Sequence, residues 1–250
     1  MRRRWWVTGA GAACAVVAVV LAVTLWPSHH AARPARTAAA PTPTVAPTTS
    51  ARPTPTPTPQ TIQDVRATAP TRFLMRGPAA QPYTIRARVC GMPYVRPLDP
   101  PGEQHHTVCW VKKDFGVAPG STSATTYILG HAWAEDRLEV MNPASEPATK
   151  QIMRSVRAGR SSKLDGITIY PTTVLNGSTI ELTTRTGVLT YTVRQVYGVA
   201  KSEAGNVASL MNEKTPRRIV IITCAEAHGT DYDYDVIVNA FLSRSRPLPA

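Results

Sequence analysis

Two residues that can form a reactive pair, Cys224 and His131, each follow a short apolar segment. Residues 218–223 read Arg-Ile-Val-Ile-Ile-Thr and lead directly to Cys224, and residues 127–130 read Tyr-Ile-Leu-Gly and lead to His131. Short apolar runs rich in β-branched residues are typical of buried strands, so both side chains are expected where a core strand runs out into a loop. A neighbouring imidazolium stabilises a thiolate, which is the nucleophilic form of cysteine. The pattern predicts Cys224 as a nucleophile and His131 as its acid and base. His228, four residues after Cys224, is a weaker candidate for the same role.

The elements that must position this pair are mostly strands. One helix, at residues 203–212 with Ser202 as its cap, is the clearest in the chain. Turn residues such as Asn176-Gly177 separate several strands. The pattern predicts a mainly β fold, a closed or nearly closed antiparallel barrel of about eight strands with one or two short helices. The predicted strands cover residues 83–89, 107–112, 125–129, 138–141, 167–170, 178–184, 188–199, 218–223 and 235–241.

The N-terminus has the pattern of a membrane anchor. Three arginines at residues 2–4 precede a stretch, residues 5–26, that holds no charged residue and has tryptophans at both ends. A helix of that length is about 33 Å long, which is enough to cross a hydrocarbon core. The positive cluster predicts a cytoplasmic tail at residues 1–4 and an extracytoplasmic C-terminal part. A cleaved signal peptide is the alternative, but its apolar region is ordinarily shorter.

Residues 27–75 are predicted to be a disordered linker, and residues 76–250 a single folded domain. Residues 27–60 are rich in alanine, threonine and nine prolines, a composition that cannot bury a core. Half of the formal net charge of +12 lies in the first 60 residues, which contain six arginines and no acid. In the rest of the chain the basic residues are scattered and no nucleic-acid motif occurs, so no nucleic-acid partner is expected.

Cys90 and Cys109 flank a proline-rich loop in the predicted domain. Two half-buried strands can bring them within bridging distance, and an oxidising compartment favours pairing. We therefore predict a disulfide, with two free buried thiols as the alternative. The pattern of a metal site is missing around them, because no CxxC or HxxH pair accompanies them. No metal and no cofactor is expected.

The order and spacing of these segments resemble the sortase family. The matching pieces are Ile128-Leu-Gly-His131, Val220-Ile-Ile-Thr-Cys224 and Val236-Ile-Val-Asn-Ala240. The resemblance covers roughly residues 82–245, and together with the anchor and linker it is greatest to the actinobacterial class E and F sortases. It implies a sortase-like barrel, Cys224 as nucleophile and His131 as acid and base. It further implies sorting signals of surface proteins and a cell-wall amine as partners.

The sequence departs from that family after Cys224. Sortases carry an arginine at the start of the last strand, where it holds the substrate or stabilises the oxyanion, whereas residues 231–236 here read Asp-Tyr-Asp-Tyr-Asp-Val. The position that corresponds to this arginine is 233, 234 or 235. The replacement candidates are the cations of Arg137, Arg217 and Arg218 and the hydroxyls of Tyr232 and Tyr234; Asp233 is a candidate partner for protonated His131.

Two functions remain open from the sequence. The first is a membrane-anchored cysteine transpeptidase that cleaves a sorting signal through a thioester and transfers the surface protein to a cell-wall amine. The alternative is a catalytically degenerate sortase-like module that binds in the cell envelope. A thiol hydrolase, in which water accepts the acyl group, differs from the first only in the acceptor.

Overall fold

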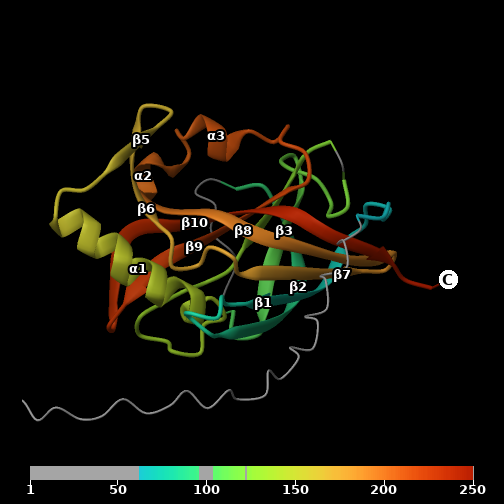
Figure 1. The fold of residues 1–250 in the computed structure, drawn as a ribbon, viewed down its shortest axis with the longest axis horizontal. Helices are drawn as coiled ribbons and strands as arrows, with labels where there is room; N and C mark the ends of the chain where they lie inside the picture. Colours follow the sequence, from blue (N-terminus) through green and yellow to red (C-terminus); the bar gives the residue numbers. More distant parts are fainter. Residues whose placement is uncertain (1–61, 96–103, 122, 250) are drawn as a thin grey trace, which may run out of the picture. The chain divides into compact units, whose positions relative to one another are not determined.

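The computed structural model describes residues 62–95, 104–121 and 123–249, in which ten strands form one sheet that closes on itself. The sheet order is β10-β9-β4-β3-β2-β1-β7-β8-β6-β5, and β10 also pairs with β8 (Figure 1). Eight strands therefore complete a barrel, and β6 and β5 extend from β8 as a side arm. The elements are β1 (Pro70–Arg76), β2 (Thr84–Pro93), β3 (Thr107–Lys113), β4 (Thr125–Leu129), α1 (Asn142–Arg157), β5 (Ser162–Leu164), β6 (Ile167–Thr172), β7 (Thr179–Thr184), β8 (Gly187–Ala200), α2 (Lys201–Ala204), α3 (Ala208–Met211), β9 (Arg218–Ala227) and β10 (Thr230–Pro247).

The barrel is of mixed type. The predicted mainly β, closed barrel is confirmed, but the prediction that it is antiparallel is wrong for two of its strand pairs. β2 runs parallel to β3, and β4 runs parallel to β9. Parallel neighbours require a long crossover connection, and the one from β4 to β9 contains the three helices and the four strands β5 to β8. Because β4 and β9 run in the same direction, the residues that follow them lie at the same end of the barrel.

Two apolar clusters bury both faces of β9. The inward-facing residues Ile219, Ile221 and Ala225 belong to the barrel core. Val220 and Ile222 face outward and pack in a second cluster with residues of α3 and the turn before it. Burial on both faces explains why the strand is continuously apolar rather than alternating.

α1 is the largest difference from the prediction. It packs against β9, β6, β8 and β10 on one flank of the barrel (Figure 1). Its buried residues include Ala144, Ala148 and Ile152, spaced four apart as one helix face requires. Pro147 lies inside the helix, and Pro143 near its start, so the segment does not read as helical. The strand predicted at residues 138–141 is instead the turn that leads into α1.

The helix predicted at residues 203–212 is also different in detail. It is two one-turn helices, α2 and α3, separated by residues 205–207, and Ser202 lies within α2 rather than capping it. The described residues thus contain three helices, one more than the upper limit predicted.

The folded part begins before residue 76. Val65 is buried, and β1 pairs with both β2 and β7, so residues 62–75 are not a linker. The remainder of the predicted linker, the tail at residues 1–4 and the membrane span at residues 5–26 lie outside the described residues. Among the helices that the structure describes, none is both long and apolar enough to cross a membrane.

The Cys90–Cys109 disulfide is confirmed. The two residues are direct partners in the parallel β2–β3 register, with their Cα atoms 4.5 Å apart. The bridge ties together two strands that lack a short connecting turn, and Cys224 is the described cysteine that forms no disulfide.

Candidate active site

The parallel pairing of β4 with β9 brings the segments that carry His131 and Cys224 to the same end of the barrel. The register ends with Leu129 opposite Ile222, and the next amide, that of Gly130, still donates to the Ile222 carbonyl at 3.3 Å. If the same register continued beyond the end of β4, His131 would lie opposite Cys224. The two predicted site residues therefore lie at one end of the barrel, although 93 positions separate them in the sequence.

The backbone of His131 is held on both sides. Its N–H donates to Oε1 of Gln104 at 3.2 Å, and its carbonyl accepts from the N–H of Met141 at 2.9 Å. The chain approaches α1 so closely here that a Cβ on Gly130 would lie 2.5 Å from Cγ of Met141. Glycine is therefore required immediately before His131. Gln104 was not predicted as part of the site, because nothing in its local sequence marks it.

Cys224 lies inside β9, three residues before its end, so the prediction that the strand stops at the thiol is wrong. β4 ends before it reaches this point, and Ser145 of α1 takes its place along the edge of β9. The Ser145 hydroxyl donates to the Cys224 carbonyl at 2.7 Å and accepts from the Glu226 N–H at 3.3 Å. A buried hydroxyl thus replaces the missing strand partner and fixes the backbone that carries the thiol.

Asp235 is the residue of β10 that lies opposite Cys224. The register shifts between Tyr232 and Asp235, so Asp233 and Tyr234 form an irregularity in the strand. The structure therefore identifies 235 as the position opposite Cys224, and an aspartate occupies it. The aspartate-rich run is part of strand β10, not a loop, and Asp231 accepts from the N–H of Ala134 at 2.9 Å.

A pocket of about 310 Å³ lies beside the cross-strand pair of Asp235 and Cys224, and Asp235 lines it. It is lined by Tyr94, Lys201, Ser202, Ala204, Gly205, Asn206, Leu210, Met211, Ile222 and Asp235. Ile222 and Asp235 are on the same face of the sheet as Cys224, because strand side chains alternate and directly paired residues share a face. The pocket therefore runs along the face of β9 that carries the thiol. Lys201 is the cation among its lining residues, and the sequence alone did not indicate it.

None of the three arginines that were candidates for the missing cation lines the pocket beside Cys224. Arg218 is buried at the opposite end of β9, about 20 Å along the strand from Cys224. Its guanidinium donates to the carbonyls of Ser209 and Asn212 at 2.7 and 2.5 Å. It therefore supports α3 rather than the site, and Arg217 lies next to it at the same end. Arg137 lies in the exposed loop after His131, outside the pocket lining.

The remaining candidates lie elsewhere. His228 is at the exposed tip of the β9–β10 hairpin with a φ of 54°, about 13 Å along the strand from Cys224. Tyr234 packs edge to face on Tyr170, and both line a different pocket. Tyr232 packs against the barrel core. None of the three lines the pocket beside Cys224.

Glu226 is a buried acid on the same face of β9, two residues after Cys224. It is 5% exposed, and its Oε1 has no protein hydrogen-bond partner. Burial, with smaller contributions from the charges of Glu146 and Asp231, raises the pKa of Glu226 to about 7. The folded state thus holds a proton on this carboxyl that an unfolded chain releases at lower pH, so this group makes stability fall as the pH rises toward 7.

No protein-family model matches the chain, and no curated protein matches it.

Solved structures similar to this chain include several sortases. Sortase A from Listeria monocytogenes is 15% identical with a TM-score of 0.41, covering 73% of this chain and 92% of that one. Sortase E1 from Streptomyces coelicolor, with a tripeptide in its active site, is 14% identical with a TM-score of 0.42, covering 72% and 91%. Sortase C-3 from Streptococcus pneumoniae is 12% identical with a TM-score of 0.40, covering 77% and 67%. At such low identities and TM-scores, these similarities carry no weight for the chain's function.

Proposed function

We propose that the chain is a membrane-anchored cysteine transpeptidase of the sortase type. It would cleave a sorting signal in a surface protein through a thioester at Cys224 and pass the acyl group to a cell-wall amine. The observation that supports this best is the parallel pairing of β4 with β9, which brings the segments that lead to His131 and Cys224 to the same end of the barrel. The predicted span at residues 5–26 would hold the domain on the outer side of the cell membrane.

The chemistry needs only these two side chains and an amine. The Cys224 thiolate attacks the carbonyl carbon of the scissile peptide bond, and the carbon–nitrogen bond breaks as His131 gives its proton to the leaving amine. This leaves a thioester and a neutral imidazole. The incoming amine attacks the thioester carbon and loses a proton to His131, and the carbon–sulfur bond breaks to restore the thiolate.

The pocket beside Cys224 is suited to an extended peptide. Its volume of about 310 Å³ accommodates a few side chains, and its floor is apolar where Leu210, Met211 and Ile222 line it. The wall formed by α2 presents Lys201 and polar groups, which can bind the peptide backbone. The identity of the sorting signal would therefore depend on α2 and α3.

The degenerate binding module remains the second candidate, and Asp235 is the observation that favours it. A carboxylate opposite the nucleophile does not stabilise an oxyanion, and losing one oxyanion donor costs roughly 10²–10³ in rate in a well-studied hydrolase. A protein that keeps the pocket without turnover would bind the same peptides and release them unchanged.

The proposal is tested by trapping the acyl-enzyme. Full-length protein is incubated with a pool of peptides of randomised sequence and with triglycine, and the products are analysed by mass spectrometry. We expect a peptide adduct on Cys224 that hydroxylamine removes, together with peptide joined to triglycine. The Cys224→Ala variant should give neither product. Transfer retained in that variant would exclude the thiol mechanism, whereas bound but uncleaved peptide would favour the degenerate module.

Lys201 is the cation best placed to take over the role of the missing arginine, because it lines the same pocket as Asp235. We expect Lys201→Met to lower the rate of thioester formation about 10²-fold, the usual effect of losing one oxyanion donor. The measurement is the single-turnover rate of adduct formation at saturating peptide. Lys214→Met, at an exposed lysine outside the pocket, is the matched control and should match the wild type. Equal rates for both variants would remove Lys201 from the mechanism.

A further inference from the structure

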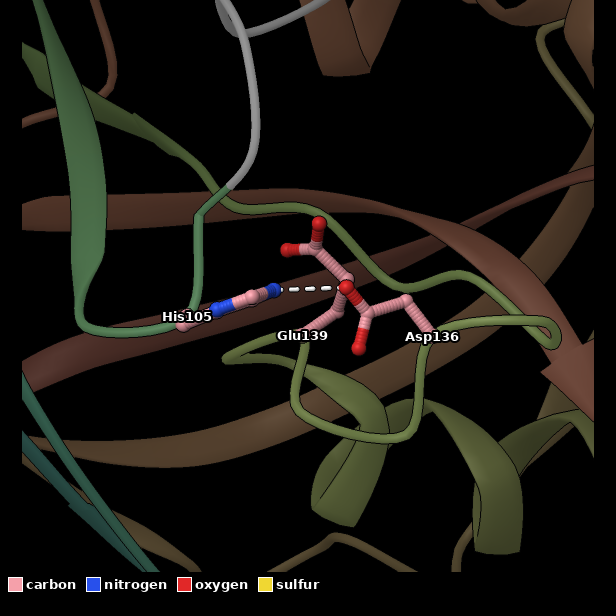
Figure 2. Close-up of side chains that lie close together, drawn as sticks. All are labelled: His105, Asp136 and Glu139. Carbon is pink, nitrogen blue, oxygen red and sulfur yellow. Dashed lines mark hydrogen bonds and ion pairs between the residues drawn. The ribbon is translucent and has the colours of Figure 1, made fainter.

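Three side chains that can bind a metal ion converge beside the segment that carries His131. His105 precedes β3, and Asp136 and Glu139 lie in the loop between β4 and α1; Figure 2 shows the three pointing toward one another. One ligand atom from each lies within 4.8 Å of the other two. Nε2 of His105 and Oδ2 of Asp136 are 2.6 Å apart. The cluster draws on two segments that are separated in the sequence, so the fold creates it.

Glu139 is buried without a cation. It is 3% exposed, and its carboxylate oxygens accept from the backbone N–H of Gln104 at 3.1 and 3.3 Å. Among the residues that the structure describes, no lysine or arginine forms an ion pair with it. A buried carboxylate is costly unless it is paired with positive charge or coordinates a metal. A cation held jointly with His105 and Asp136 would supply that charge.

Asp136 is ready to act as a ligand and is open to solvent. Its Oδ1 accepts from the N–H of Leu138 at 2.9 Å. Its Oδ2 lies 2.6 Å from Nε2 of His105, so the carboxylate is already held toward the other ligands. The side chains of His105 and Asp136 are 31% and 24% exposed, which leaves an ion a route from solvent to the buried Glu139.

We propose that His105, Asp136 and Glu139 bind a divalent first-row transition-metal ion of the Zn²⁺ type. This departs from the expectation, drawn from the sequence, that the chain has no metal site. Such a site was hidden because its ligands come from positions 105, 136 and 139, a spacing that no short motif describes.

The donor set selects the class of ion. Zn²⁺ is bound by imidazole nitrogen and carboxylate oxygen at about 2.0–2.2 Å, which puts neighbouring ligand atoms roughly 3–3.5 Å apart. Small side-chain rotations close the present 4.8 Å spread to that range. Ca²⁺ and Mg²⁺ prefer oxygen ligands alone and more of them. One nitrogen and two carboxylates leave at least one coordination position for water.

The ion would stiffen the frame around His131. Gln104, which donates to Glu139 through its N–H, accepts from the His131 N–H through its side chain. Val140, next to Glu139, donates to the Gln104 carbonyl at 3.0 Å, and Met141 donates to the His131 carbonyl. The two ligand segments thus hydrogen-bond to both sides of the His131 backbone. An ion that bridges the segments would restrict their movement and so fix the position of that backbone.

The test uses full-length protein titrated with Zn²⁺, with Ca²⁺ in parallel, followed by isothermal calorimetry and thermal unfolding. The variants are His105→Ala, Asp136→Asn and Cys224→Ala, with His106→Ala as the matched control at an exposed neighbouring histidine. We expect one Zn²⁺ site in the wild type, His106→Ala and Cys224→Ala. At a free Zn²⁺ concentration a hundred-fold above Kd, their Tm should rise by about 5–10 °C. His105→Ala and Asp136→Asn should lose both effects, and Ca²⁺ should produce neither.

A second measurement reads the coupling to His131. Hydrogen exchange of residues 132–141 should slow on Zn²⁺ addition in the wild type and His106→Ala, but not in His105→Ala. Zn²⁺ binding that survives His105→Ala and disappears in Cys224→Ala would overturn the proposal, because the ion would then occupy the thiol site. Equal Tm values with and without Zn²⁺ in the wild type would overturn it too and leave a purely hydrogen-bonded cluster. Neither readout depends on enzymatic activity.

Discussion

Replacing His131 with alanine should lower the labelling rate of Cys224 at pH 6 about 100-fold. An ordinary thiol has a pKa near 8.5 and is less than about 1% thiolate at pH 6. An adjacent imidazolium stabilises the thiolate and lowers that pKa by several units in known Cys–His pairs. The parallel register of β4 and β9 brings the segments that carry the two residues to the same end of the barrel. The measurement is the pH dependence of the reaction with a thiosulfonate, with the Cys90–Cys109 bridge kept oxidised.

His228→Ala is the matched control, because it removes the other histidine near Cys224 in sequence while leaving the strand ends intact. It should label like the wild type. A wild-type profile that rises only near pH 8.5, and that His131→Ala does not change, would contradict an ion pair. In that case Cys224 is an ordinary thiol. The carboxylate of Asp235 opposite it, which disfavours a second negative charge, would account for the high pKa.

Arg218→Met should destabilise the domain by about 4 kcal/mol. The buried guanidinium donates to the carbonyls of Ser209, Leu210 and Asn212 and to the hydroxyls of Thr125 and Tyr127. Methionine fills a similar volume but donates to none of them, and each buried acceptor left unsatisfied costs about 1–3 kcal/mol. The measurement is the free energy of unfolding from urea denaturation.

Arg217→Met is the matched control, which tests whether the loss of stability in Arg218→Met depends on the burial of that arginine. Its side chain is exposed at the same end of β9, so the free energy of unfolding should change by less than about 0.5 kcal/mol. Because Arg218 anchors α3, its replacement should also weaken peptide binding in the pocket that Leu210 and Met211 line. Equal stability of the two variants would show that α3 is held by apolar packing alone.

The strands were predictable because their pattern is local. Eight of the nine predicted segments overlap a strand of the structure, namely β2, β3, β4, β6, β7, β8, β9 and β10. Runs of β-branched residues and alternation of apolar and polar residues directly indicate which side chains are buried. The parallel pairings were not predictable in the same way. They join segments far apart in the chain, and no short pattern specifies which strand lies beside which. Consequently the sequence identified Cys224 and His131 as candidates, but only the closed barrel shows that their strands are paired and run in the same direction.

The parts of the site that the sequence missed come from outside the strands. Ser145 lies in α1, whose two prolines disguise the helix, and Gln104 lies in a loop with no distinguishing pattern. Lys201 enters the pocket only because β8 leads directly into α2. The sequence also left open which of residues 233–235 lies opposite Cys224. The irregularity in β10 shifts the β9–β10 register, and the alternation of side chains along the strand does not show by how much.

The distance in sequence between β4 and β9 affects the life of the newly made protein. His131 is synthesised long before Cys224, and the two reach the same end of the barrel only when the last strands close it. Until then the nascent polypeptide carries an ordinary, weakly nucleophilic thiol. Contacts between remote segments form late in folding, because the entropy of closing the intervening loop must first be overcome. For the proposed thiol mechanism, the reactive form of Cys224 would therefore be delayed until synthesis and folding are complete, which would spare the unfinished chain, and the proteins around it, from misdirected thiol chemistry.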